Sequence, residues 1–340
     1  MVRVLSDEDV ASVLDLEDLL PVVADAFRKA EAGEVERPER PHYPIGAGLE
    51  SDSSTGETAE PTGTGLCMPA YVHGADYAAT KLVTVVDDNP ERGLPTVTAQ
   101  IALADAETGQ PVGYLAGNRI TGARTGCIGG LAARELAPEP DEQDTLDVAV
   151  IGAGTQARWQ TRAIATATDA DLESVRVYSP SDSRFDCAAD LEAELDASVE
   201  AVSSPAAAVE DASIVVTATT STEPVFPGDA LEPNALVIAV GAYTPEMREL
   251  DATTVERAER VVADVPSEAL ETGDLRGFPA LEDEIESLGA ALSDDSPRHQ
   301  QRGSGIVVVE SVGSAVLDAA AAAFVFDRAA ERGVGTTVPL

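Results

Sequence analysis

The segment Val148–Ala157 reads VAVIGAGTQA and places Gly152, Gly154 and Ala157 at the spacing Gly-x-Gly-x-x-Ala. An apolar, strand-like run precedes the glycines, and a helix-forming stretch follows them. In such a strand–turn–helix the first glycine permits a tight turn, and the second lets the backbone approach a pyrophosphate. The third small residue allows helix and strand to pack closely, and free N–H groups at the helix N-terminus favour phosphate. The motif predicts a dinucleotide-binding Rossmann unit, against the alternative of a glycine-rich turn that holds no ligand.

Strand-like runs and helix-forming stretches alternate from this motif onward. The runs are Leu146–Gly152, Ser174–Ser179, Ser213–Thr219, Ala235–Gly241 and Arg260–Val265. Helix formers such as Cys187–Leu195 lie between several of them. Alternation of this kind is typical of a parallel sheet covered by helices. A last run, Gly305–Ser311, leads into an alanine-rich helix expected at Val316–Ala330.

Before the motif the pattern changes. Two apolar runs bounded by turn residues, Ala78–Val86 and Thr96–Ala104, predict paired strands. Apolar residues near helical spacing predict one amphipathic helix within Val10–Phe27. Thr121–Leu136 is expected to be a helix rich in small residues. The polar, glycine-containing stretch Gly46–Gly65 predicts a surface loop.

These patterns predict an α/β protein with two domains, for which a length of 340 residues suffices. A Rossmann NAD(P)-binding domain is expected over residues 126–309, and an α+β substrate-binding domain over residues 1–125. The final helix is expected to return to the α+β domain. That domain is then discontinuous, with residues 310–340 as its second piece.

The composition is strongly acidic: 61 Asp and Glu face 22 Lys and Arg, for a formal net charge of −39. Only two of the cations, Lys29 and Lys81, are lysines. Counterions in molar salt screen the repulsion within such a surface, so the composition predicts a halophilic protein. The charge argues against nucleic acid or an anionic membrane as partner.

The first ten residues, MVRVLSDEDV, contain no apolar signal core, and no window approaches 18 uninterrupted apolar residues. The three cysteines, Cys67, Cys127 and Cys187, lack metal-ligand spacing. We therefore expect a cytoplasmic, reduced protein without a metal site.

The choice of cofactor depends on the end of the second strand of the Rossmann unit. An acid there would bind the ribose 2′-hydroxyl of NAD. This chain instead has Ser179 and Ser181, with Arg184 just beyond, which could meet a 2′-phosphate. The pattern favours NADP over NAD, although Asp182 could fold back to a ribose and Arg184 could be an ordinary solvated residue.

Lys81 is an unusual residue because it lies inside an apolar run, YAATKLVTVV, of a chain that almost lacks lysine. We interpret it as a positive charge that faces a substrate carboxylate or carbonyl and can transfer protons. The alternative is a lysine on an edge strand whose ammonium reaches solvent.

Arginines supply the other candidate cations. Arg124 lies where a loop enters a helix rich in glycine and alanine, and it could clamp a carboxylate through two parallel hydrogen bonds. A capping or ion-pairing role is the alternative. Arg37 and Arg40, on a Pro-rich loop, are a further candidate pair, against the alternative of solvated side chains.

Together these segments resemble the ornithine cyclodeaminase/mu-crystallin family. The resemblance runs through most of the chain, in RPERPHYPI, LCMPAY, TKLVTVVDDNPERGLPTVTAQIALADAETGQPV, ITGARTGCIGGLAARELA, VAVIGAGTQARWQ, VVTATTSTEPVF, AVGAYTPEMREL and VESVGSAVLD. The part from DDNPERGLPTV to RTGCIGG, with IGAGTQARWQ, is similar to the archaeal alanine dehydrogenase branch. So long an ordered series is more specific than the glycine motif alone.

The resemblance implies a homodimer that pairs through the sheets of its substrate-binding domains, which then also serve dimerisation. It implies that Lys81 and Arg124 are catalytic. Residues expected to bind the substrate are Arg40, Lys81, Thr96, Arg124, Tyr243 and Val312. Cofactor contacts expected from motif and resemblance together are Gly152, Gly154, Thr155, Gln156, Ala157, Ser179, Ser181, Arg184, Thr217, Thr219, Ala239, Val240, Gly241 and Ser311.

Tyr243 is a departure from the cyclodeaminase pattern. Cyclodeaminases that resemble this chain carry an aspartate at this position, where it can activate water or take a proton. Tyrosine has an unperturbed pKa near 10 and is a poor general base at neutral pH. Glu246 is nearby but out of register.

The resulting hypothesis is an NAD(P)-dependent oxidoreductase that interconverts a small L-amino acid and its 2-oxo acid or imine, as an alanine dehydrogenase or a ketimine reductase does. Two alternatives remain at this point. One is ornithine cyclodeaminase, which would form proline and ammonia with NAD used catalytically. The other is a non-catalytic binding protein like mu-crystallin.

Overall fold

The computed structural model describes residues 1–48, 60–138, 145–271, 273–293 and 305–339. The chain forms two compact units. The first contains Met1–Asp15, Gly33–Thr121 and Ala315–Leu340, and the second contains Leu16–Ala32 and Gly122–Ser314. The units are defined by how densely their residues pack, which is not a test of the predicted domain boundaries. Those boundaries stay predictions.

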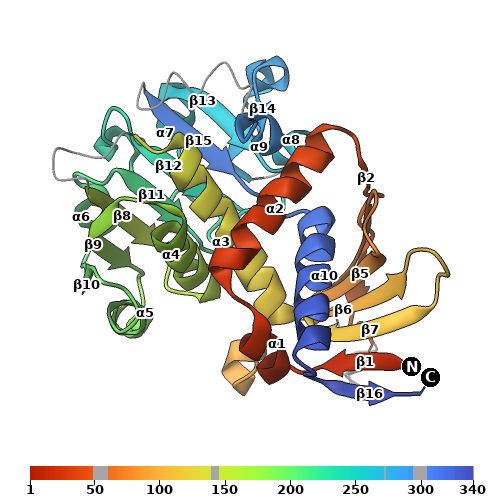
Figure 1. The fold of residues 1–340 in the computed structure, drawn as a ribbon. Helices are drawn as coiled ribbons and strands as arrows, with labels where there is room; N and C mark the ends of the chain where they lie inside the picture. The colour runs from red at the N-terminus through yellow and green to blue at the C-terminus, as the bar shows by residue number, and fades with distance from the viewer. Residues whose placement is uncertain (49–59, 139–144, 272, 294–304, 340) are drawn as a thin grey trace, which may run out of the picture. The chain divides into compact units, whose positions relative to one another are not determined.

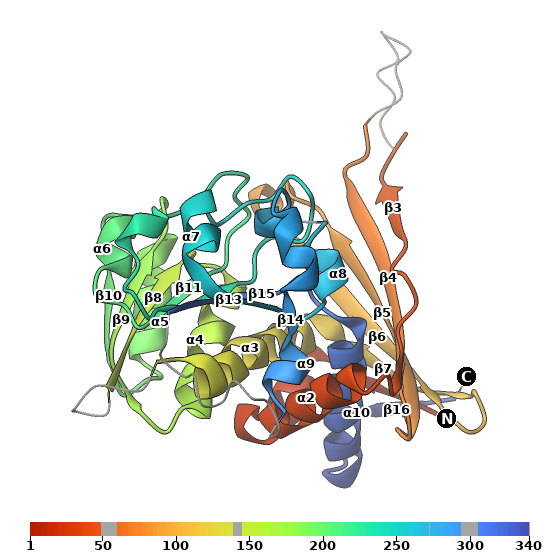
Figure 2. The same cartoon turned by 90° about the horizontal axis from the view of Figure 1, so that it is seen from above.

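The first unit is built on an eight-stranded mixed sheet in the order β16-β1-β7-β6-β5-β4-β2, with β3 beside β4. Its strands are β1 (Val2–Leu5), β2 (Val35–Glu36), β3 (His42–Ile45), β4 (Gly63–Val72), β5 (Tyr77–Val85), β6 (Val97–Asp105), β7 (Pro111–Ala116) and β16 (Thr336–Val338). Neighbours from β4 to β7 are antiparallel (Figure 2). The pairing of β5 with β6 confirms the two strands predicted there.

Helix α10 (Ala315–Glu331) packs on β4 and β5 of this sheet (Figure 1). The predicted alanine-rich helix is thus confirmed, and its small side chains allow the helix to approach the strands closely. Near its end, Phe326 meets the ring of Tyr77 edge to face, with centroids 5.2 Å apart. The short 3₁₀ helix η1 (Asn89–Arg92) connects β5 to β6.

The single amphipathic helix predicted near the N-terminus is wrong, because the structure has two. Helix α1 (Asp7–Val13) begins at a capping box formed by Ser6 and Asp9 and ends where Leu14 becomes extended. Helix α2 (Leu16–Glu31) follows at once but belongs to the second unit. The apolar spacing continues through the break because each of the two helices buries an apolar face. Periodicity alone therefore could not reveal the break.

The predicted loop Gly46–Gly65 is wrong at its end, where Gly63–Gly65 belongs to β4. A Cβ on Gly65 would lie 2.5 Å from the ring of Tyr43 on β3, so glycine here permits strand packing rather than a turn. The middle of the predicted loop lies outside the described residues.

The second unit contains an eight-stranded parallel sheet in the order β10-β9-β8-β11-β12-β15-β13-β14. Its strands are β8 (Thr145–Ile151), β9 (Asp171–Tyr178), β10 (Ser198–Ala201), β11 (Ile214–Thr217), β12 (Leu236–Ala239), β13 (Ala258–Ala263), β14 (Glu286–Ser287) and β15 (Ile306–Glu310). The first five in chain order have the spatial order 3-2-1-4-5 of a doubly wound dinucleotide fold. The strand runs predicted from the sequence are confirmed.

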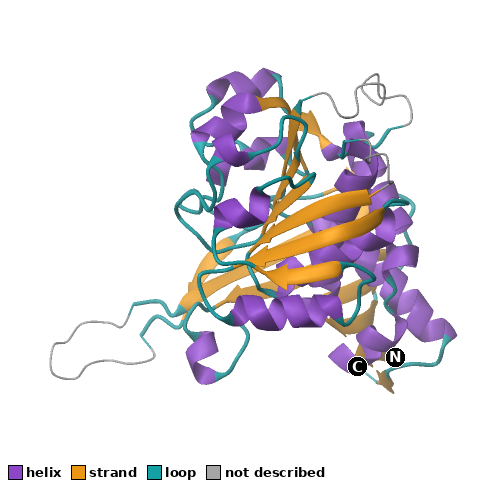
Figure 3. Cartoon of the chain, turned by 90° about the vertical axis from the view of Figure 1, so that its left-hand side faces the viewer, coloured by secondary structure: helices purple, strands orange, loops and turns teal. Residues whose placement is uncertain are grey.

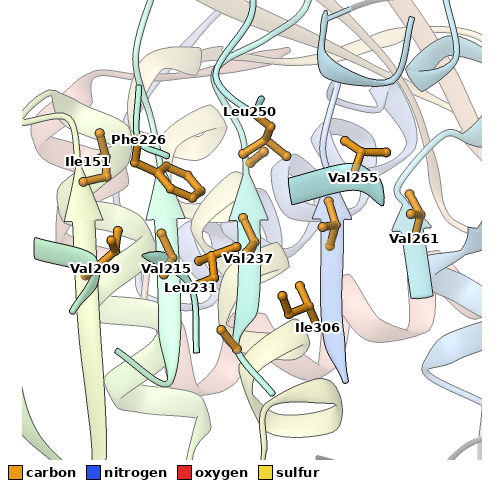
Figure 4. Close-up of a cluster of buried hydrophobic side chains, with 14 of the residues drawn as sticks. Ile151, Val209, Val215, Phe226, Leu231, Val237, Leu250, Val255, Val261 and Ile306 are labelled. Carbon is orange, nitrogen blue, oxygen red and sulfur yellow. The ribbon is translucent and has the colours of Figure 1, made fainter. Parts of the chain in front are cut away.

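Helices connect these strands (Figure 3). They are α3 (Gly117–Leu136), which enters from the first unit, α4 (Thr155–Ala167), α5 (Ser183–Glu192), α6 (Pro205–Val209), α7 (Ala252–Arg257), α8 (Pro266–Ala269) and α9 (Leu288–Ala291), with the 3₁₀ turns η2 (Gly228–Ala230), η3 (Gly273–Leu275) and η4 (Pro279–Asp283). Buried branched side chains of the strands form a core with Phe226 and Leu250 from the connections (Figure 4).

Glycines on α3 explain its unusual composition. A Cβ on Gly122 or Gly126 would lie within 2.6 Å of Trp159 on α4, and one on Gly130 would lie 2.6 Å from the carbonyl oxygen of Ala163. At Gly126 and Gly130 the two helices therefore approach each other backbone to backbone, and at Gly122 the indole of Trp159 packs directly against α3.

Candidate active site

The glycine turn joins β8 to α4 at the point where the strand order reverses. Gly152 has φ +113°, and a Cβ there would lie 2.4 Å from the carbonyl oxygen of Ala218 after β11. Its N–H donates to the carbonyl of Tyr178 at the end of β9 (2.8 Å). Only glycine can thread the chain between these two neighbours at this angle.

Gly154, in contrast, faces open space. It is the N-cap of α4 with an extended backbone, and a Cβ there would meet nothing within 4 Å. No side chain caps this helix, so the first-turn N–H groups, including those of Thr155 and Gln156, have no intrahelical acceptors. An exposed glycine before an uncapped helix N-terminus fits a pyrophosphate.

Arg158, which the sequence did not single out, stabilises this turn. Its Nη1 donates to the carbonyls of Ala153 (2.6 Å) and Gly154 (3.3 Å). Its guanidinium also pairs with Asp190 at 2.7 Å. An arginine one position after Ala157 looks like an ordinary helix residue in sequence, so nothing there revealed this contact.

The predicted ribose residues lie together in the loop between β9 and α5. Ser179 is buried, and its hydroxyl lies 3.3 Å from that of Ser181. Arg184 donates to the carbonyls of Ser179 (3.3 Å) and Ser181 (2.7 Å), and its guanidinium stacks 4.4 Å from the ring of Phe185. Asp182 is almost fully exposed, 3.7 Å from Arg184. A cation is thus held at this loop.

The predicted cofactor contacts on β11 and β12 also lie side by side. Thr217 and Ala239 are paired last residues of these strands. Glu249, which the sequence analysis missed, accepts hydrogen bonds from three groups of this region: Thr217 Oγ1 (2.9 Å), Thr219 N–H (2.6 Å) and Gly241 N–H (2.8 Å). In a chain with 61 acids, no sequence signal separated this carboxyl from those on the surface.

Further buried carboxyls lie near Glu249. Asp274 of η3 accepts the N–H groups of Glu249 and Leu250, both at 2.7 Å. Glu310, at the end of β15, is fully buried, and no group in the described ranges donates a hydrogen bond to either of its oxygens. Burial raises the pKa of Glu249 to about 7 and of Asp274 to about 6. Burial, and then the negative charge of Asp274, raises the pKa of Glu310 well above its usual range.

Arg124 of α3 is almost fully buried beside the segment that follows β15. A Cβ on Gly313 would lie 3.6 Å from its guanidinium. Asp264 holds the same segment by accepting from the Ser311 hydroxyl (2.8 Å), Val312 N–H (3.0 Å) and Gly313 N–H (2.8 Å). Burial raises the pKa of Asp264, and the attraction of Arg124 opposes that rise. Arg124, Ser311 and Val312 are therefore brought together.

Lys81 lies on β5 in the first unit, an interior strand between β4 and β6. Its side chain is 3% exposed, and its Nζ lies 2.5 Å from Asp318 Oδ2 on α10, which is 1% exposed. The interpretation of Lys81 as a solvated edge-strand lysine is therefore wrong. Asp318 went unnoticed because it sits in an alanine-rich helix whose other residues signal only packing.

The remaining predicted substrate residues are placed as follows. Arg40 is half-buried just before β3, and Arg37 is half-buried earlier on the same connection. Thr96 is half-buried just before β6, and its carbonyl accepts the N–H of Val86 (2.9 Å). Tyr243 is half-buried in the segment after β12. Their roles stay predictions.

The part of the chain that the structure describes contains neither a metal-ligand cluster nor a membrane-spanning helix. No group of three or more His, Cys, Asp or Glu residues there could hold a metal ion. No helix there has both the length and the apolar character needed to cross a membrane.

A parallel sheet of order 3-2-1-4-5, with a glycine turn and an open helix N-terminus at its switch point, defines a dinucleotide-binding α/β protein. The chain belongs to the ornithine cyclodeaminase/mu-crystallin family, whose model matches residues 2–333. The family resemblance and the predicted fold class are confirmed.

Relatives cover nearly the whole chain. The Delta(1)-pyrroline-2-carboxylate/Delta(1)-piperideine-2-carboxylate reductase of Azospirillum brasilense is 33% identical over 98% of both chains. The structure of Thermococcus litoralis Delta(1)-pyrroline-2-carboxylate reductase with NADH and L-proline is 28% identical, with TM-score 0.84 and coverage of 99% of this chain and 100% of that one. An archaeal alanine dehydrogenase dimer with bound NAD is 26% identical, with TM-score 0.84 and coverage of 100% and 99%.

Proposed function

We propose that this chain is an NAD(P)-dependent oxidoreductase that reduces a small imine bearing a carboxylate to the corresponding L-amino acid, and that catalyses the reverse reaction. The observation that carries the proposal is the buried Lys81–Asp318 pair in a protein with an open dinucleotide turn at Gly154. A cation buried in an apolar sheet needs an anionic partner. A buried lysine can also bind a negatively charged group of a substrate or transfer a proton to it.

The substrate class follows from the cations and from the relatives. Arg124 and Arg40 are proposed to hold the α-carboxylate, since a guanidinium binds a carboxylate through two parallel hydrogen bonds. The relatives are named for cyclic imines and for alanine. These compounds share a carboxylate beside the reacting carbon. We expect a C=N carbon next to a carboxylate, with a small apolar remainder.

In this proposal the Nζ of Lys81 donates a proton to the imine nitrogen, and Asp318, 2.5 Å away, positions the lysine side chain. Arg124 and Arg40 orient the carboxylate so that the C=N carbon meets the cofactor in one pose. The nicotinamide, when bound, supplies or accepts the hydride. Ser311 and Val312, which Asp264 holds, are proposed to contact the cofactor and the substrate, respectively.

Cyclodeamination of ornithine is not proposed, because position 243 is a tyrosine, whereas the family resemblance implies an aspartate there in cyclodeaminases. A phenol with an ordinary pKa near 10 is a weak base at neutral pH.

The test follows the absorbance of NADH and of NADPH in molar KCl. Delta(1)-pyrroline-2-carboxylate, Delta(1)-piperideine-2-carboxylate, pyruvate with ammonia, and ornithine are offered separately. Cofactor oxidation with a cyclic imine, or with pyruvate and ammonia, supports the proposal. Proline formed from ornithine without net cofactor oxidation, with all imines inert, would identify a lyase and overturn it.

NADP is proposed as the preferred cofactor, because Arg184 is held at the loop where a 2′-phosphate would lie and no acid ends β9. The Ser179→Asp variant should shift the ratio of NADPH to NADH affinity toward NADH by about tenfold, because its carboxylate repels a 2′-phosphate and accepts from a 2′-hydroxyl. Ser198→Asp, which adds the same charge at an exposed position of β10, should leave the ratio unchanged. Equal shifts in both variants would show that net charge, not this position, sets the preference.

A homodimer is proposed through the face of the mixed sheet that points away from α10. Leu82 on β5 and Tyr114 on β7 lie on this face, 41% and 42% exposed, and Val4 on β1 lies opposite Tyr114. Leu82→Glu should convert dimers to monomers in sedimentation runs in molar KCl, because it buries a charge in an apolar contact. Leu94→Glu, at a more exposed apolar position outside the sheet, is the control. A dimer that survives Leu82→Glu would place the interface elsewhere.

A further inference from the structure

The carboxyl of Glu249 connects two strand ends that belong to the proposed cofactor site. Oε2 accepts from Thr217 Oγ1 and Gly241 N–H, and Oε1 accepts from Thr219 N–H. The approach is close: a Cβ on Gly241 would lie 2.6 Å from the Glu249 carboxyl carbon. One side chain therefore fixes the chain after β11 and the chain after β12 against each other.

These donors suit a carboxylate better than a carboxylic acid, because two of the three are backbone N–H groups that can only donate. A proton on Oε1 would point at the N–H of Thr219, which is a donor itself. A proton on Oε2 could be donated only to the Thr217 hydroxyl, which would have to turn and accept it, and the N–H of Gly241 would then donate to a neutral oxygen. Gain of a proton therefore leaves the N–H groups of Thr219 and Gly241 facing a neutral carboxyl, and neutral hydrogen bonds are about half as strong as charge-assisted ones.

The surroundings make that proton gain possible near neutral pH. Glu249 is fully buried, which raises its pKa to about 7, and the charge of Asp274 acts in the same direction. Glu310 lies within electrostatic range of Glu249 and Asp274, with Asp264 as a further negative neighbour. Arg248 is the cation near Asp274, and Arg124 faces Asp264.

We propose that Glu249 is a positioning residue that, as a carboxylate, holds Thr217–Thr219 and Gly241 in the conformation that receives the dinucleotide, and that its protonation weakens dinucleotide binding. The inference rests on the proposed function, since it presumes that the ends of β11 and β12 contact a cofactor. It assigns the site a dependence on pH that resides in the protein and not in the substrate.

The experiment measures the dissociation constant of NADH by fluorescence titration in molar KCl from about pH 6 to about pH 9, without substrate. NADH is the probe because a 2′-phosphate itself titrates near pH 6. For the wild type, the dissociation constant should rise by up to about tenfold per pH unit as the pH falls below about 7. Glu249→Gln, which keeps the shape but cannot ionise, should bind about tenfold more weakly at high pH, with little dependence on pH. Glu246→Gln removes an exposed acid from the same segment and should retain the wild-type profile.

Two outcomes overturn this inference and leave the proposed function intact. One is a wild-type dissociation constant that does not change with pH, and the other is a Glu249→Gln dissociation constant that changes with pH in parallel with the wild type. The wild-type measurement decides even if Glu249→Gln fails to fold. Absence of NADH and NADPH binding at every pH would overturn the proposed function and, with it, this inference. A purely structural role for Glu249 would change thermal stability but would leave the slope of affinity against pH intact.

Discussion

Lys81→Met is expected to lower kcat/KM by about 100- to 10,000-fold with every imine, because it removes the proton-bearing cation from the proposed site. Lys29→Met is a matched control, since Lys29 is the chain's other lysine and pairs with Asp25 on the surface of α2 at 3.5 Å. It should leave turnover unchanged. Steady-state kinetics of the two variants in molar KCl would decide.

Stability must be separated from chemistry, because Lys81→Met leaves Asp318 as a buried charge without its cation. Removing one partner of a buried pair costs about 3–5 kcal/mol in the free energy of unfolding. The double variant Lys81→Met/Asp318→Asn should recover most of that stability in denaturant unfolding and stay as inactive as the single variant. Recovery of turnover in the double variant would show that Lys81 acts only through stability.

Gly152→Ala is expected to lower stability, whereas Gly154→Ala is expected to lower NADH affinity without unfolding the protein. At Gly152 the positive φ and the 2.4 Å approach to Ala218 make a side chain costly, on the order of 2–4 kcal/mol in the free energy of unfolding. At Gly154 a methyl group meets no protein atom, so stability should change by less than about 1 kcal/mol. The same methyl group would occupy the space of the pyrophosphate, and NADH affinity should fall about 10- to 100-fold.

Thermal unfolding and NADH titration of both variants check this pair. The informative variant is Gly154→Ala, because its fold is expected to be intact. NADH affinity equal to that of the wild type would mean that the open space at the N-terminus of α4 is not where a pyrophosphate lies.

The elements of the fold were predictable where local pattern and tertiary environment agree. The strand before Gly152 and the alanine-rich helix that became α10 show the same apolar pattern in sequence and in space. Prediction failed where the same sequence pattern is compatible with two different structures. The apolar spacing from Val10 to Phe27 continues while the helix breaks at Leu14. Gly65, near the start of β4, resembles a turn residue in the sequence, but in the structure it makes room for Tyr43.

The candidate site was predictable in its cations and not in its anions. Lys81 is visible because lysine is rare in this chain, and Arg124 because small residues surround it. Asp318 and Glu249 are each one acid among 61, and composition gives no hint that they are buried. Burial is a property of the folded chain, so the partners that fix these cations and strand ends became visible only in the structure.

The close contact between α3 and α4 has an experimental consequence. Trp159, the only tryptophan, lies on α4 two residues after Ala157 and packs against Gly122 and Gly126. Its indole is therefore an intrinsic optical probe at a defined place, one turn from the N-terminus of α4, where the proposed dinucleotide turn lies. Tryptophan emission overlaps the absorption of reduced nicotinamide, so energy transfer from this single donor would report NADH at the turn, free of background from any second tryptophan.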